Sequence, residues 1–206
     1  MKLYLIRHGQ TDWNVAGKIQ GSTDIPLNAM GKRQAACLAE GMKNRPVVRV
    51  FSSVLSRAYE TACSIGDSQG VEVRKIQGLE EVGYGVWEGM TMEEIQKQYP
   101  KELEQWYNSP VDVAPPGGES QAQIYERCAK ALDTILSDQD GDVAMVSHGA
   151  TVVYLLEYML RDDSRTEEDD IIVGNASIST IEYDPLTGRF ALVQLNDREH
   201  LKGLED

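Results

Sequence analysis

The stretch Lys2-Leu3-Tyr4-Leu5-Ile6-Arg7-His8-Gly9-Gln10-Thr11 decides how this chain folds. Its run of apolar and β-prone residues predicts a buried strand. Gly9 permits a sharp turn and a close backbone approach, so Arg7 and His8 are expected at the carboxyl end of that strand. Open α/β sheets bind their ligands at this end of the strands. The beginning of the sequence therefore predicts part of a binding site.

A second apolar segment, Asp142 to Ala150, ends in the same way at His148-Gly149. A single His-Gly pair is more often an ordinary turn with an incidental histidine. The chain has three histidines, and two of them follow an apolar strand and precede a glycine. We interpret these two segments as halves of one site.

The remaining sequence alternates between strand and helix patterns. The expected helices begin at the N-cap Asn28, at Ser56, at the capping box Thr91-x-x-Glu94, at Pro100, at Ser120 and after His148, and the expected strands cover 47–53, 71–76, 177–183 and 190–195. This order predicts a mainly parallel sheet covered by helices on both faces, and the closing hairpin makes at least one strand antiparallel. We expect a single domain over 1–206, with a helical, cap-like insertion at about 91–113. The tail after Asn196 is expected to fray.

Arg57 lies in the first turn of a helix that follows a predicted parallel strand. A cation opposes the helix dipole at this end, so its position is favourable if it helps the helix amides to hold an anion. The alternative is a surface arginine on a solvated turn. Together with Arg7, His8 and His148, it predicts an anion site assembled from distant parts of the sequence.

Composition narrows the function further. The net charge is −13, which argues against sequence-independent binding to nucleic acid. The sequence has no apolar stretch long enough to span a bilayer and no signal-peptide pattern, so we expect a soluble, cytoplasmic protein without a membrane partner. No phosphate-binding Gly-x-x-x-x-Gly-Lys motif is present, and the histidines lack carboxylates at ligand spacing. We therefore expect no metal and no other cofactor, and a histidine nucleophile.

An alkoxide leaving group needs a proton, which a glutamate can supply. The loop from Gly78 to Gly89 offers Glu80, Glu81 and Glu88. Spacing does not distinguish among them, and any one taken singly could simply face solvent.

Taken together, the motifs resemble the histidine phosphatase superfamily, in its phosphoglycerate-mutase-like branch. The segments that carry the resemblance are Leu5-Ile6-Arg7-His8-Gly9-Gln10-Thr11-x-x-Asn14, Ser52-Ser53-x-x-x-Arg57-Ala58-x-x-Thr61-Ala62, Leu79-x-Glu81-x-x-x-Gly85-x-Trp87-Glu88-Gly89, Pro116-Gly117-Gly118-Glu119-Ser120 and Val146-Ser147-His148-Gly149. They occur in the family's order over about residues 1 to 183.

The resemblance implies a three-layer α/β/α sandwich and a role for each matching residue. His8 would become phosphorylated, while Arg7, Arg57 and His148 bind the phosphoryl group. Glu81 matches the general acid and base, and Asn14 a residue of the phosphate pocket. Thr11 and Gly149 are expected to line the same pocket.

Within the family, the sequence favours a metal-independent phosphomonoester hydrolase. The segment from Thr91 to Val113 has only Lys97 and Lys101 as cations, whereas the family's mutases carry more basic residues there. The length and the Gly85-x-Trp87-Glu88-Gly89 element resemble α-ribazole and broad-specificity phosphatases, with phosphoserine phosphatases close by. A phosphoglycerate mutase and a non-catalytic phosphate-binding module remain alternatives. The sequence chooses neither the substrate nor between a monomer and a homodimer, and the acidic loop 162–170 shows no evident chemistry.

Overall fold

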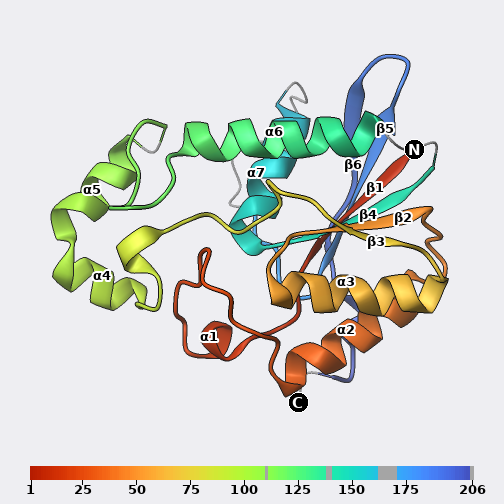
Figure 1. The fold of residues 1–206 in the computed structure, drawn as a ribbon, viewed down its shortest axis with the longest axis horizontal. Helices are drawn as coiled ribbons and strands as arrows, with labels where there is room; N and C mark the ends of the chain where they lie inside the picture. The colour runs from red at the N-terminus through yellow and green to blue at the C-terminus, as the bar shows by residue number, and fades with distance from the viewer. Residues whose placement is uncertain (110, 138–140, 162–170, 205–206) are drawn as a thin grey trace.

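The computed structural model describes residues 1–109, 111–137, 141–161 and 171–204, and the acidic loop 162–170 lies outside them. In the described part of the chain the strands form one sheet in the order β3-β2-β4-β1-β5-β6 (Figure 1). The strands are β1 (Lys2–Arg7), β2 (Arg49–Ser52), β3 (Val73–Lys75), β4 (Val143–Ser147), β5 (Ile178–Asp184) and β6 (Arg189–Asp197). The helices are α1 (Asp12–Val15), α2 (Ala29–Met42), α3 (Ser56–Gln69), α4 (Met92–Gln98), α5 (Pro100–Asn108), α6 (Gln121–Ser137) and α7 (Gly149–Leu160), with 3₁₀ turns η1 (Gly85–Trp87) and η2 (Glu199–Leu201).

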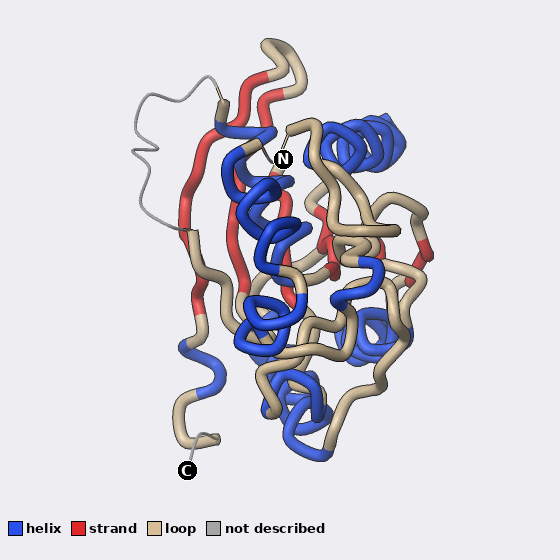
Figure 2. Tube along the Cα trace, turned by 90° about the vertical axis from the view of Figure 1, so that its left-hand side faces the viewer, coloured by secondary structure: helices blue, strands red, loops and turns tan. Residues whose placement is uncertain are grey.

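Helices cover both faces of the sheet, which confirms the predicted α/β class (Figures 1 and 2). Side chains of a strand alternate between faces, so Leu3 and Leu5 pack with α6 and α7, whereas Tyr4 and Ile6 pack with α2 and α3. Both faces of β1 are buried. This is why the opening stretch reads as a nearly continuous apolar run.

The strand order determines where the predicted site residues lie. β4 pairs in parallel with β1 on one side and with β2 on the other. Arg7 is opposite Ser147, and Ser52 is opposite Val146. The carboxyl ends of β1, β4 and β2 are therefore neighbours, and the residues that follow them meet at one edge of the sheet. β5 pairs antiparallel with β1 and β6, as the closing hairpin predicted.

Helices α4 and α5 lie away from the sheet (Figure 1), within the expected insertion at about 91–113. They have an apolar core of their own, centred on Trp87, Ile95 and Leu103. The capping box that predicted α4 is present, with the Thr91 side chain accepting from Glu94 and the Glu94 side chain accepting from Thr91. Tyr99 and Trp106 pack against this core, whereas Tyr107 is exposed.

Two expectations were incomplete or wrong. The segment from Gln10 to Pro26, for which no helix was expected, contains the one-turn helix α1, which Thr11 caps together with Asn14. The tail after Asn196 does not fray before residue 204. Leu201 is buried, and Nε2 of His200 hydrogen-bonds to the Ala176 carbonyl at 2.8 Å. The contact between His200 and Ala176 joins segments far apart in sequence, so the local pattern did not show it, whereas the cap of α1 by Thr11 and Asn14 is a local signal.

Among the described residues, no helix is long and apolar enough to cross a lipid bilayer.

Candidate active site

His8 is held as a neutral imidazole. It follows β1 directly and its side chain is buried. Its Nδ1 lies 2.6 Å from the Gly9 carbonyl oxygen, which can only accept, so Nδ1 carries the proton and Nε2 keeps its lone pair. Burial, together with the charges of Arg57 and Arg7, lowers the pKa of His8 well below its ordinary value. The imidazole is therefore unprotonated at Nε2 near neutral pH.

The turn after His8 depends on a close approach of two backbone segments. A Cβ atom on Gly9 would lie 2.5 Å from the Gly31 carbonyl oxygen at the start of α2. A side chain at position 9 would push the turn away from α2 and carry with it the carbonyl that orients His8.

His148 lies against His8 as the second half of the predicted site. The two ring centroids are 5.1 Å apart in an edge-to-face arrangement. Nδ1 of His148 accepts from Nε of Arg57 at 3.2 Å, and its Nε2 lies 2.8 Å from Oγ of Ser53. Both ring nitrogens thus have protein partners, so a hydrogen bond from His148 to phosphate would replace one of these contacts. Its predicted phosphate contact stays a prediction.

Arg57 is fully buried in the first turn of α3, so the surface alternative is wrong. Besides its contact with His148, its Nη1 donates to the Thr23 carbonyl and its Nη2 to the Gly21 carbonyl, each at 2.8 Å. A guanidinium has more N–H donors than these contacts use. Three hydrogen bonds therefore fix the position of Arg57, and its remaining N–H groups are available to bind an anion.

Arg7 provides the clearest sign of an anion site. Its Nη1 donates to the Val173 carbonyl at 2.7 Å, but its Nε is buried and has no hydrogen-bond partner among the described residues. An unsatisfied buried N–H costs about 1–3 kcal/mol, which a bound anion would offset. Gly149 lies directly beside this guanidinium, since a Cβ there would make an ordinary van der Waals contact with Cζ of Arg7 at 3.4 Å.

Asn14 is oriented with its amide nitrogen free to donate. Its Oδ1 accepts from the backbone N and Oγ1 of Thr11 and from Nδ2 of Asn175, at 3.0, 3.1 and 3.2 Å. The Thr11 hydroxyl also contacts Gln20 at 2.8 Å. This buried hydroxyl is thus occupied in orienting Asn14, and its predicted contact with phosphate stays a prediction.

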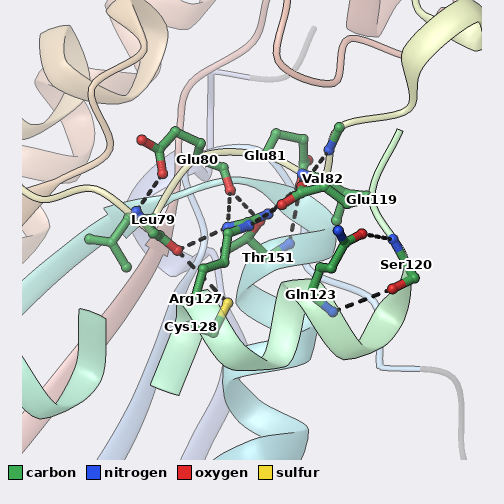
Figure 3. A network of polar contacts seen from close by, with 12 residues as sticks. Leu79, Glu80, Glu81, Val82, Glu119, Ser120, Gln123, Arg127, Cys128 and Thr151 are labelled. Carbon is green, nitrogen blue, oxygen red and sulfur yellow. Dashed lines mark hydrogen bonds and ion pairs between the residues drawn. The ribbon is translucent and has the colours of Figure 1, made fainter. Parts of the chain in front are cut away.

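Of the three glutamates that spacing left open, Glu81 is the one directed at the site. It is the carboxylate that raises the pKa of both Arg7 and Arg57, against the larger lowering by burial. Its Oε1 accepts from the backbone N of Thr151 at 3.1 Å (Figure 3). The Thr151 hydroxyl donates to the Glu80 carbonyl at 2.6 Å and lies 3.2 Å from the same Oε1. Its Oε2 has only a 3.4 Å contact, from the backbone N of Ala150, among the described residues. One oxygen is anchored on the first turn of α7, and the other is available for proton transfer.

The other two carboxylates have structural partners. Oε2 of Glu80 accepts from the backbone N of Gly78 at 2.5 Å. Glu88 accepts from the backbone and hydroxyl groups of Ser22 and Thr23 and from the backbone N of Tyr84. Burial raises the pKa of Glu88, but these hydrogen bonds bring it below its ordinary value. A carboxyl group held as an anion is unsuited to donating a proton.

Sequence reasoning missed several residues that orient these groups. Thr151 holds Glu81, and Asn175 donates to the His8 carbonyl at 3.1 Å as well as to Asn14. The only sequence signal for Thr151 is its place in the first turn after His148-Gly149. Asn175 gives no such signal, because its loop meets His8 only in the folded chain. The described residues contain no group of three or more His, Cys, Asp or Glu side chains that could hold a metal ion.

Comparisons with known proteins show which proteins this chain is similar to. The chain is 36% identical over 149 residues to phosphoserine phosphatase 1 of Hydrogenobacter thermophilus, covering 72% of this chain and 71% of that one. It is 31% identical over 205 residues to a probable phosphoglycerate mutase of Yersinia enterocolitica, covering 98% and 95% of the two chains. The solved alpha-ribazole phosphatase from Shigella flexneri superposes with a TM-score of 0.83 at 26% identity, covering 96% of each chain.

The family inferred from the motifs is confirmed by a match to its family model that extends over residues 3–198. The chain belongs to the histidine phosphatase superfamily, branch 1.

Proposed function

We propose that this protein hydrolyses a small phosphomonoester through a phosphohistidine on His8. The observation that carries the proposal is the hydrogen bond from Nδ1 of the buried His8 to the Gly9 carbonyl, because it leaves Nε2 as the nucleophile. The unpartnered Nε of Arg7 supports an anion beside it.

In the first step, Nε2 of His8 attacks phosphorus while the phosphoryl oxygens contact Arg7 and Arg57. The N–P bond forms, the ester P–O bond breaks, and Glu81 gives its proton to the leaving oxygen. Fixed guanidinium groups stabilise the charge that develops on the phosphoryl group, and one such donor is worth about 100- to 1,000-fold in rate.

In the second step, the Glu81 carboxylate takes a proton from water as the water oxygen attacks phosphorus. The N–P bond breaks, its electron pair returns to Nε2, and inorganic phosphate leaves. Glu81 is protonated again and His8 is neutral, so the site is ready for another substrate. The anchoring of Oε1 on Thr151 supports this exchange, because it keeps the carboxyl group in one place in both steps.

Labelling with a ³²P-labelled substrate, quenched in an alkaline denaturant, tests the proposal. We expect acid-labile, base-stable label on the wild-type protein and none on His8→Ala, which should not turn over. His200→Gln is the matched control, because His200 lies on η2 and contacts Ala176 instead of the site groups; it should keep the label. Full turnover by His8→Ala would reject the mechanism.

The names of the relatives suggest substrates to try, namely phosphoserine and α-ribazole phosphate. A panel of these with sugar phosphates and 3-phosphoglycerate would rank them by kcat/KM.

A mutase is the second candidate, favoured by the probable phosphoglycerate mutase that matches nearly the whole chain. Against it, Lys97 in α4 is largely exposed and pairs with Glu93. Isomerisation of 3-phosphoglycerate that needs a bisphosphate and exceeds hydrolysis would place the mutase first. Phosphate binding without turnover across the panel would instead indicate a non-catalytic module.

A further inference from the structure

The loop that carries Glu81 is held on both sides by one ion pair. Arg127 on α6 donates from Nη1 to the carbonyls of Gly78 and Glu80, each at 2.9 Å (Figure 3). These carbonyls belong to the residues before Glu81. A side chain from another layer of the fold thus fixes the backbone that leads into the proposed acid.

Glu119, from the Pro116-Gly117-Gly118-Glu119-Ser120 motif, holds the residues after Glu81. Its Oε2 accepts from the backbone N of Gly83 at 2.8 Å, and its own backbone N donates to the Gly83 carbonyl at 2.8 Å. The carboxylate also meets Arg127 through two contacts, Nε to Oε1 at 2.8 Å and Nη2 to Oε2 at 3.1 Å. The pair contacts the loop at Gly78, Glu80 and Gly83 and so straddles Glu81.

The geometry of this pair differs from that of surface ion pairs. The side chains of Arg127 and Glu119 are 19% and 28% exposed, and they meet through two parallel contacts. By contrast, Lys130 and Glu126 on the same helix are 74% and 67% exposed. A bidentate, partly buried arginine–carboxylate pair is geometrically specific, whereas an exposed i,i+4 pair contributes only about 0.3–0.5 kcal/mol. The Arg127–Glu119 pair is therefore suited to fixing a loop.

Among the described residues, Arg127 hydrogen-bonds to Glu119 and to the carbonyls of Gly78 and Glu80 only. Neither member of the pair hydrogen-bonds to His8, Arg7 or Arg57 among the described residues. Loss of the pair should thus displace Glu81 and leave the nucleophile and the phosphate contacts in place. Displacing a catalytic group by about 1 Å can cost about 100-fold in rate.

We propose that Arg127 and Glu119 are positioning residues for general acid catalysis by Glu81. The inference rests on the proposed function, because it assigns Glu81 the proton that the leaving oxygen receives. It predicts a signature that depends on the leaving group. An alcohol leaves poorly without a proton, whereas a nitrophenolate leaves without one, so misplacing the acid should slow only the alkyl ester.

The test compares kcat/KM for an alkyl phosphate, such as phosphoserine, with that for p-nitrophenyl phosphate. This parameter reports steps up to P–O cleavage, so slow hydrolysis of the phosphohistidine does not obscure it. For Arg127→Gln we expect a loss of about 10- to 100-fold with the alkyl ester and less than about 3-fold with the aryl ester. Glu119→Gln keeps an oxygen near Gly83 but removes the charge, and should show the same pattern more weakly. Lys130→Gln, which removes an exposed cation from the same helix, should change neither value.

A double variant tests whether Arg127 acts through Glu81. Glu81→Gln alone should slow the alkyl ester more than Arg127→Gln does, and adding Arg127→Gln to it should change kcat/KM less than about 3-fold further. Thermal unfolding of each variant shows whether it is folded at the assay temperature. If Arg127→Gln does not fold, Glu119→Gln carries the same comparison.

Equal losses with both esters in a folded variant would overturn the inference, as would no loss in either Arg127→Gln or Glu119→Gln. Failure of the proposed function looks different: the wild-type protein would hydrolyse neither ester, and no phosphate would appear on His8.

Discussion

Nε of Arg57 donates to Nδ1 of His148 at 3.2 Å. This contact joins the first turn of α3 to the residue that caps α7, and it fixes the tautomer of His148 with the proton on Nε2. The contact also occupies the Nε–H group of Arg57, so an anion has to bind to N–H groups on the two Nη atoms. The cation and the imidazole therefore form a single unit, and changes at either one should affect phosphate binding.

Replacing Arg57 by lysine should abolish this unit while keeping the charge. One ammonium group cannot reach His148 and the carbonyls of Gly21 and Thr23 in the same planar geometry. We expect kcat/KM to fall about 100- to 1,000-fold for every phosphomonoester, whatever its leaving group. Steady-state kinetics measure this, with Arg33→Lys, at an exposed position on α2, as the control. Retention of wild-type kcat/KM by Arg57→Lys would mean that the planar geometry of the guanidinium is unimportant for catalysis.

Asn14→Asp should separate structure from phosphate binding. The aspartate keeps an oxygen for Thr11 and Asn175 but presents a second, negatively charged oxygen where the amide nitrogen was. We expect repulsion of about 1.4 kcal/mol or more, hence at least about a tenfold rise in KM and in the inhibition constant of inorganic phosphate. Inhibition constants that match the wild type would show that this amide does not face the bound anion.

Glu88→Gln should weaken the anion site indirectly. Glu88 binds Ser22 and Thr23, and this loop supplies the carbonyls that hold Arg57. An amide would turn an NH₂ group toward some of these donors, so we expect a loss of about 1–3 kcal/mol in unfolding free energy. We also expect a fall in kcat/KM that is the same for alkyl and aryl esters. Denaturant unfolding and kinetics test both, with the exposed Glu93→Gln as control; a loss confined to alkyl esters would contradict the prediction.

Stability should decrease as the pH falls below about 6.5. Burial lowers the pKa of His8 and His148 well below the ordinary histidine value of about 6.5, so below that pH the unfolded chain binds more protons than the folded chain. The sign of the linkage then requires the unfolding free energy to drop with falling pH, by at most about 1.4 kcal/mol per pH unit for each histidine. Denaturant unfolding between pH 7 and pH 5 measures the slope, which should be shallower for a His8→Asn, His148→Asn double variant. An unchanged slope would mean that these histidines do not contribute.

The pH dependence of kcat/KM should differ from the pH dependence of stability over the same pH range. Because the pKa of His8 is lowered, Nε2 stays unprotonated below the ordinary histidine range, and kcat/KM should not fall with an apparent pKa near 6.5 on the acid side. A pH–rate profile checks this with the wild-type protein. An acid limb at that pH would show that the nucleophile titrates like a free histidine.

The sequence by itself determined the α/β class, most helix starts and the family. The apolar run of β1 is buried on both faces of the sheet, so its continuous apolar pattern could be recognised in the sequence alone. Local caps, such as Asn28 at α2 and Thr91 with Glu94 at α4, depend on neighbouring residues and formed as expected. The motifs around His8, Arg57 and His148 identified the family before any contact was known.

Only the tertiary structure decided which groups meet and in what state. Spacing could not choose among Glu80, Glu81 and Glu88, because the choice depends on donors from α7 and from the loop at Ser22. The hydrogen bonds of His148 join segments far apart in sequence. So do the hydrogen bonds that Arg127 and Glu119 make with the loop that carries Glu81. Such contacts depend on the strand order that brings β4 between β1 and β2. A local sequence pattern does not reveal that order.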